Sequence, residues 1–65
     1  MSDNAAVLDG YTEEVVIRTP NRDEFPALVR PGTDYTETFR CWDMDEQEFI
    51  TVNPWRVVVR PGPIA

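Results

Sequence analysis

Histidine and lysine are absent from this chain of 65 residues, and there is a single cysteine, Cys41. Without histidine, the chain lacks the commonest general base near neutral pH. Cys41 therefore has no imidazole partner that could generate a reactive thiolate, and we interpret it as a small buried hydrophobic residue. A lone cysteine forms no internal disulfide, so nothing in the composition marks the chain as secreted.

Glycines and long apolar runs are also scarce. The three glycines, Gly10, Gly32 and Gly62, lie too far apart to form a phosphate-binding loop. No apolar run approaches the roughly 20 residues of a membrane span, and the start of the chain is acidic where a signal peptide is basic. We therefore expect a cytoplasmic protein, in the host cytoplasm if a phage encodes it, that is not an enzyme and needs no cofactor.

Basic residues are outnumbered, since twelve carboxylates oppose six arginines and give a net charge of -6. This charge excludes direct binding to phosphate backbones, which needs clustered lysine or arginine, and it favours a protein partner with a basic surface. Two explanations for the use of arginine alone stay open. One is the base composition of a GC-rich genome, and the other is a set of interface contacts that need the planar guanidinium.

The length leaves room for one small domain. We expect a flexible arm at residues 1–10, a single domain at residues 11–62 and a tail at residues 63–65. Segments rich in β-branched and aromatic residues, separated by turn formers, predict strands at residues 13–19, 25–30, 34–42, 47–52 and 55–60.

Residues 34–42 decide the fold class. At period two, Phe39 and Cys41 share one face and Trp42 lies on the other, whereas at helical spacing Tyr35, Phe39 and Trp42 line up. The threonines and aromatic residues favour a strand. We therefore predict an all-β fold, a small five-stranded SH3-like barrel. The helical alternative is an α+β fold with a three-stranded antiparallel sheet and one helix.

Three large or rigid side chains carry further expectations. Pro26 has no N–H, so its strand should be short or lie at a sheet edge. Trp55 should face the core from the last strand. Trp42, beside Arg40 and opposite the core, has the composition of an interface hot spot.

The densest charge is the cluster Asp43, Asp45, Glu46 and Glu48, which we expect in an exposed hairpin turn. An EF-hand is excluded, because Glu48 and Pro54 occupy the positions that need glycine and glutamate. The cluster is then a solvated turn, an anionic patch that engages a basic protein surface, or a weak metal-binding site. Our candidate site takes the second interpretation and contains no metal.

The tetrapeptide VRPG occurs twice, at residues 29–32 and 59–62. The flanking sequences differ, so we interpret the two copies as strand ends rather than as a repeated unit. In each, the arginine should project to solvent, the proline end the ladder and the glycine permit a turn. If the two strands lie close together, Arg30 and Arg60 would form one basic spot, and Arg60 is our last candidate contact residue.

The end of the chain, WRVVVRPGPIA, is similar to the C-terminal end of the small inhibitor of host RNA polymerase made by T7-like phages. That family is also acidic and of nearly the same length. Arg60 matches one of its two alternating arginines, whereas Val58 stands where the other would be, and the family has a helix where we expect a hairpin. The resemblance implies a mobile-element protein that docks on the bacterial polymerase and blocks transcription without catalysis.

The leading hypothesis is a non-catalytic acidic module, encoded by a phage or other mobile element, that inhibits a host nucleic-acid-handling protein such as RNA polymerase. Its carboxylates, those of the cluster with Glu13 and Glu14 as further candidates, would act as a DNA mimic in a basic groove that normally meets phosphates. The alternative is a cement protein of a phage-like assembly, whose arm and tail lie across neighbouring subunits. A third hypothesis is an adaptor that binds extended peptides along an aromatic groove.

Overall fold

A computed structural model describes residues 10–62 of the chain. The arm expected at residues 1–10, apart from Gly10, and the tail at residues 63–65 lie outside the described residues. Within residues 10–62 there is no helix long and apolar enough to cross a membrane. The strands are β1 (Glu13–Thr19), β2 (Arg22–Val29), β3 (Phe39–Asp43), β4 (Glu48–Val52) and β5 (Val58–Pro61).

These five strands form one sheet in the order β4-β3-β2-β1-β5, and every neighbouring pair is antiparallel. The all-β prediction is therefore confirmed, and β3 and β4 form the expected hairpin rather than a helix. The ladders described do not close the sheet into a barrel. β4 and β5 are its two edges, and no Cα atom of β4 lies within 8 Å of one in β5.

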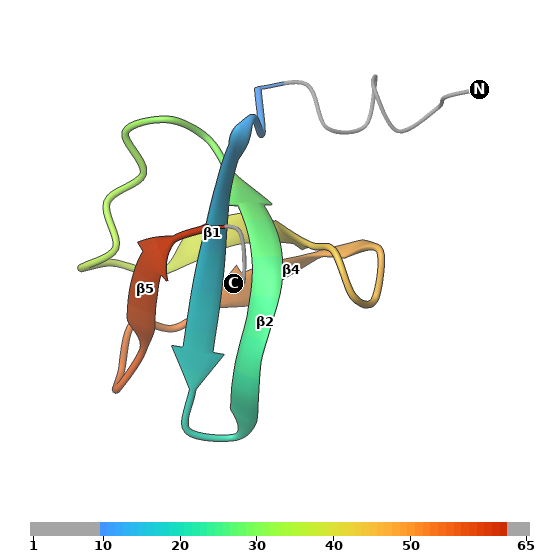
Figure 1. The fold of residues 1–65 in the computed structure, drawn as a ribbon. Coiled ribbons are helices and arrows are strands. Elements are labelled where there is room, and N and C mark those ends of the chain that lie inside the picture. Colours follow the sequence, from blue (N-terminus) through green and yellow to red (C-terminus); the bar gives the residue numbers. More distant parts are fainter. Residues whose placement is uncertain (1–9, 63–65) are drawn as a thin grey trace.

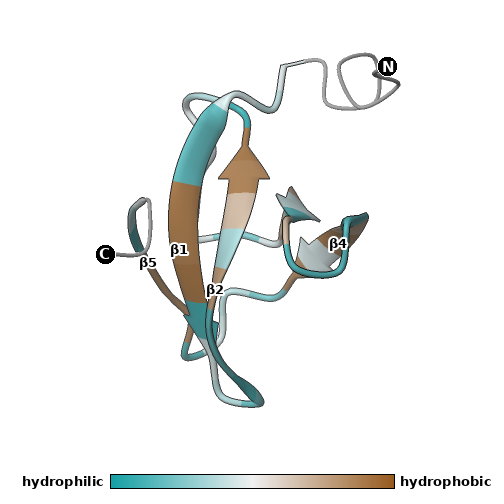
Figure 2. Ribbon diagram, turned by 45° about the vertical axis from the view of Figure 1, so that its right-hand side comes forward, coloured by the Kyte–Doolittle hydropathy of each residue, from teal (hydrophilic) through white to brown (hydrophobic). Residues whose placement is uncertain are grey.

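The core lies between the two halves of this folded sheet. In Figure 1, β1, β2 and β5 run side by side, and β4 crosses behind them. Figure 2 shows that β1 is hydrophobic in its centre and polar at both ends, as expected for a strand that crosses a core. Alternate residues of the strands point inward. The buried cluster comprises Val15, Ile17, Phe25, Ala27, Val29, Phe39, Cys41 and Val52.

Pro26 lies in a central strand, because β2 is eight residues long and pairs with both β1 and β3. The expectation of a short or edge strand is therefore wrong. The Pro26 carbonyl accepts a hydrogen bond of 3.1 Å from the Met44 N–H, just beyond the end of β3. Because the nitrogen and carbonyl of one residue face the same side of an antiparallel strand, the proline nitrogen also points past this end. Its missing donor therefore affects the pair with Met44, beyond the last residue of β3, which has one bond instead of two.

β3 begins at Phe39, later than expected, because a turn holds the residues before it in a loop. The Asp34 carboxylate accepts hydrogen bonds from the N–H and the hydroxyl of Thr36, at 2.9 and 2.5 Å. Aspartate side chains commonly form such a turn by accepting a bond from the backbone two residues further on. It separates β2 from β3 without adding to the sheet.

Trp55 does not face the core. It is 65% exposed and lies in the turn before β5. The Asn53 side-chain oxygen accepts a hydrogen bond of 2.9 Å from the Trp55 N–H, and Arg56 has a φ of 56°. The prediction of a core tryptophan is wrong because the strand begins only at Val58.

The first VRPG copy is a tight turn, as predicted. The Thr33 N–H donates to the Arg30 carbonyl at 3.2 Å, and Gly32 has a φ of +81°. A turn with proline followed by a residue at positive φ needs glycine or asparagine at that second place. Glycine serves here for its backbone conformation.

The second copy uses glycine for a different reason. Pro61 still belongs to β5, opposite Val15, so it does not end the ladder as expected. The Gly62 N–H then donates to the Glu14 carbonyl at 3.1 Å. A Cβ atom at Gly62 would lie 3.0 Å from the Glu14 Cγ and 3.2 Å from its backbone. Glycine is needed here for its lack of a side chain.

Substitution of each glycine by asparagine should distinguish the need for positive φ at Gly32 from the need for a missing side chain at Gly62. G32N keeps a residue that tolerates positive φ in open space, so the free energy of unfolding should change by less than about 1 kcal/mol. G62N forces a side chain against β1 and should cost about 1–3 kcal/mol. Urea denaturation of both variants checks this, and equal losses would contradict the assignment.

Candidate functional site

Asp43, the first residue of the acidic cluster, lies inside the domain. Alternation along β3 places it on the same side as Phe39 and Cys41, and all three are buried. Its carboxylate accepts two hydrogen bonds from the Arg22 guanidinium, at 2.6 and 3.4 Å. Arg22 also stacks on the ring of Phe25, 3.8 Å from the centroid. The expectation of a fully exposed cluster is therefore wrong at Asp43.

The Asp43 carboxylate also caps the turn that follows it. Its Oδ1 accepts hydrogen bonds from the N–H groups of Asp45 and Glu46, at 2.9 and 3.2 Å. Burial alone would raise the pKa of Asp43, but the bonds from Arg22 and from these backbone groups hold the pKa below its ordinary value of 3.8. The hydrogen bond to Asp43 in turn raises the pKa of Arg22.

The other three carboxylates of the cluster, Asp45, Glu46 and Glu48, are exposed, and we call them the acidic turn. The Gln47 N–H donates a backbone hydrogen bond of 2.7 Å back across this turn, and Gln47 has a φ of 58°. Asp45 lies 3.5 Å from Arg22. The turn is thus a fixed group of carboxylates with one guanidinium beside it.

Trp42 lies on the side of β3 that faces away from the core and is half-buried. Its ring meets Phe49 edge to face, with centroids 5.0 Å apart, and Tyr11 packs on Phe49 at the same distance. The guanidinium of Arg40 lies 4.4 Å from the Phe49 centroid, and that of Arg30 lies 5.2 Å from Tyr11. We call these five side chains the aromatic–arginine patch. It brings the predicted contact residues Trp42 and Arg40 together, directly next to the acidic turn along the hairpin.

Arg60 lies apart from this group. It is on β5, opposite Val16, and its guanidinium binds the Glu24 carboxylate at 3.0 and 3.3 Å. This ion pair connects β2 and β5 across β1, lowers the pKa of Glu24 and raises that of Arg60. The two strands that carry VRPG do not pair, because β1 lies between β2 and β5, and Arg30 stacks on Tyr11 whereas Arg60 binds Glu24.

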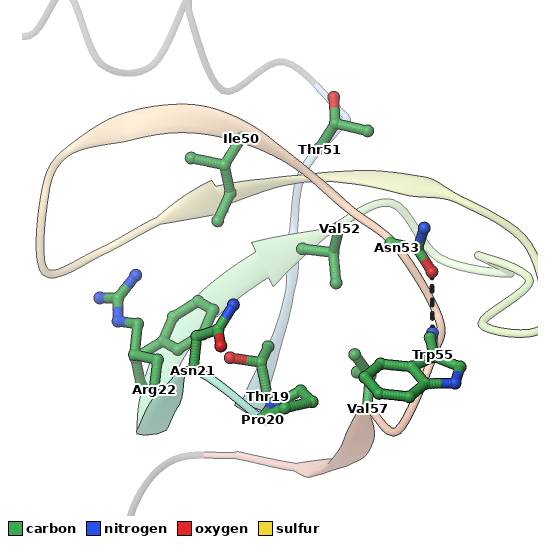
Figure 3. Close-up of a pocket in the computed structure, with 11 residues that line it drawn as sticks. Thr19, Pro20, Asn21, Arg22, Ile50, Thr51, Val52, Asn53, Trp55 and Val57 are labelled. Carbon is green, nitrogen blue, oxygen red and sulfur yellow. Dashed lines mark hydrogen bonds between the residues drawn. The ribbon is translucent and has the colours of Figure 1, made fainter.

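An open cavity of about 480 Å³ lies on the core side of β4, where the sheet is not closed. Figure 3 shows Ile50 and Val52 pointing into it, with Trp55 and Val57 on the opposite side. The turn between β1 and β2, residues 19–22, forms the remaining wall. Sequence patterns did not predict this cavity.

Among residues 10–62, neither the Cys41 thiol nor the acidic cluster forms a reactive thiolate or a metal site. Burial raises the pKa of the Cys41 thiol to about 11, so a thiolate is scarce at neutral pH. Within residues 10–62, no three cysteine, aspartate or glutamate side chains gather in a way that could hold a metal. The arrangement instead provides surfaces: the acidic turn, the aromatic–arginine patch and the cavity.

Sequence reasoning missed three of the aromatic residues on these surfaces. Phe49 lies opposite Trp42 in the hairpin register. The length of the turn sets this register, so a correct assignment of the turn would have predicted the pair. Trp55 follows Asn53 and Pro54, a turn signal that places the next residue on a loop. Tyr11 carries no such signal, since its contact with Phe49 joins distant parts of the chain.

The fold and these surfaces define the class as a small all-β domain. Comparison of the chain with protein-family models, with curated proteins and with solved structures finds no match. Function therefore has to be inferred from the geometry of the site.

The ion pair of Asp43 with Arg22 predicts a pH-dependent stability. Because the pKa of Asp43 is lower in the folded than in the unfolded chain, the pair stabilises the domain above about pH 4, and the contribution is lost as the pH falls through the folded-state pKa. D43N should cost about 2–4 kcal/mol near neutral pH and flatten the loss of stability in acid. Glu24 and Asp34 also have lowered pKa values and remain in both proteins, so the difference between their denaturation curves isolates Asp43. Parallel curves would contradict this account.

Cys41 should report on the opening of the core. It is fully buried and its pKa is raised, so a maleimide should modify the native chain at least about 100-fold more slowly than the urea-unfolded chain. Mass spectrometry of timed samples measures the rate. Rapid modification of the folded protein would show that Cys41 is accessible without unfolding.

Proposed function

We propose that this protein is a non-catalytic binding module that engages a basic protein surface with the β3–β4 hairpin. The observation that carries the proposal is the acidic turn, in which Asp45, Glu46 and Glu48 are exposed while the buried carboxylate of Asp43 holds the backbone in place. A fixed turn presents its charges without a large cost in chain entropy on binding. It is therefore suited to recognition rather than to mere solubility.

Charge complementarity would set the rate of association. Arg22 pairs with Asp43 and Asp45, and with Glu46 and Glu48 the four carboxylates outnumber this guanidinium, so this end of the hairpin keeps a negative charge. Such a charge attracts a basic surface at long range, and salt weakens the attraction.

The aromatic–arginine patch would supply the contact area. Trp42, Tyr11 and Arg40 belong to the residue types that dominate interface energies, and they lie directly beside the acidic turn. Mutual stacking limits their freedom before binding, which reduces the cost of ordering them. A negative turn and an anchoring patch on one hairpin fit a single partner surface.

A nucleic-acid-handling protein is the partner class that we propose, because its phosphate-binding groove offers the basic surface that the acidic turn requires. The likeness of the last strand to the phage inhibitor of RNA polymerase supports an inhibitory role in a host cell. Arg60, which carries part of that likeness, already binds Glu24, so a partner would have to replace this ion pair. The alternative role in a phage-like assembly depends on the arm and the tail, which lie outside the described residues.

Paired charge removals at two places test the proposal. E46Q/E48Q should lower the association rate several-fold at low salt and reduce its dependence on salt, because both carboxylates belong to the acidic turn. D23N/E37Q, which removes the same charge from exposed positions outside the hairpin, is the control and should behave like the wild type. Partners captured from a bacterial lysate with each protein, at low and at high salt, are identified and their binding rates measured. Capture of only neutral or acidic partners, insensitive to salt and to both variants, would refute the proposal.

A further inference from the structure

β4 is an edge of the sheet, and one hydrogen bond on its neighbour fixes the direction of its free backbone groups. The Met44 N–H, just after β3, donates to the Pro26 carbonyl of β2. Backbone groups point alternately to the two sides of an antiparallel strand, so those of Trp42 also face β2, whereas those of Cys41 face β4. Ile50, which lies opposite Cys41, therefore faces β3. The N–H and C=O of Thr51 then point outward, where no backbone group of residues 10–62 pairs with them.

The cavity lies beside this free edge. Thr51 is among the residues that border it, yet Figure 3 shows its side chain pointing away, so the backbone of β4 forms that border. Ile50 and Val52, on either side of Thr51, point into the cavity. An unpaired donor and acceptor thus stand between two apolar side chains that enter the same space.

Trp55 forms the opposite wall of the cavity (Figure 3). Its backbone is held by the Asn53 side chain, and the guanidinium of Arg56 covers its ring at 4.7 Å from the centroid. The residue is nevertheless 65% exposed, beside the half-buried Val57. A large, rigid aromatic side chain next to an apolar hollow is typical of a contact that a partner completes.

We propose that this edge and cavity bind an extended segment of another protein, which adds as a strand alongside β4. The residue opposite Thr51 would exchange both of its backbone hydrogen bonds with Thr51. The side chains before and after that residue would share the face of Ile50 and Val52 and enter the cavity, where one of them contacts Trp55. The site therefore selects a segment with two apolar residues separated by one residue of any kind.

The occupant follows from the shape and chemistry of the site. An added strand is the ligand whose backbone satisfies the outward groups of Thr51, and the alternation of its side chains matches a cavity that lies on one face of β4 only. The segment FITV, residues 49–52, carries no charge or proline that would block such pairing. This site is separate from the acidic turn and does not depend on the proposed function.

Proline at position 51 tests the proposal directly. T51P removes the outward N–H but no bond to β3, so the domain should stay folded, as circular dichroism checks. T51V keeps the N–H and is the matched control. The probe is a displayed library of random linear peptides, from which the wild type should enrich sequences with two apolar residues spaced by one. A selected peptide should bind T51P and W55A roughly tenfold more weakly than T51V, and E46Q/E48Q should bind it like the wild type.

Three results would overturn the proposal. The first is a failure to enrich any peptide with this spacing. The second is equal binding of a selected peptide to T51V, T51P and W55A. The third is a concentration-dependent dimer of the wild type that T51P abolishes, since the edge would then serve a second copy of this chain.

Discussion

The buried ion pair between Asp43 and Arg22 is the interaction on which the rest of the structure depends. The Asp43 carboxylate joins the beginning of β2 to the end of β3 and also caps the turn that leads into β4. Because Asp43 is fully buried, removal of either partner would leave a charge without compensation in the core. The position of the hairpin, and with it the acidic turn and one wall of the cavity, follows from this contact.

The other side-chain contacts of the arginines suit a guanidinium better than the ammonium of lysine. Four of the six arginines stack on aromatic rings, at 3.8 to 5.2 Å from the centroids, and Arg60 binds Glu24 through two of its nitrogens. A planar guanidinium can stack and donate at the same time, whereas the ammonium of lysine offers a point charge. In a domain with a small core, stacked guanidinium groups cover aromatic rings that would otherwise be exposed to solvent. The arginine-only composition therefore has a physical role, whatever the base composition of the gene.

Sequence patterns predicted what depends on neighbouring residues along the chain. β1 matches the expected strand from Glu13 to Thr19, and the preference for a strand over a helix at residues 34–42 is confirmed from Phe39 onward. The errors at Pro26 and Asp43 concern contacts between strands. A proline is tolerated in a central strand only where the adjacent ladder stops, and an aspartate is buried only where an arginine from another strand meets it. Neither condition can be read from spacing along one strand.

The short turn after β4 gives rise to two features of the cavity, the free edge of β4 and the exposed Trp55. Asn53 and Pro54 end β4, because proline cannot donate to a ladder and the asparagine side chain bends the backbone toward Trp55. The chain therefore leaves the edge of β4 and returns beside β1 as β5, so no strand within residues 10–62 covers the outward groups of Thr51. The same bend lifts Trp55 out of the core and places it across the hollow from Val52. An open strand edge and an exposed tryptophan are thus two consequences of one local sequence, which explains why they lie together.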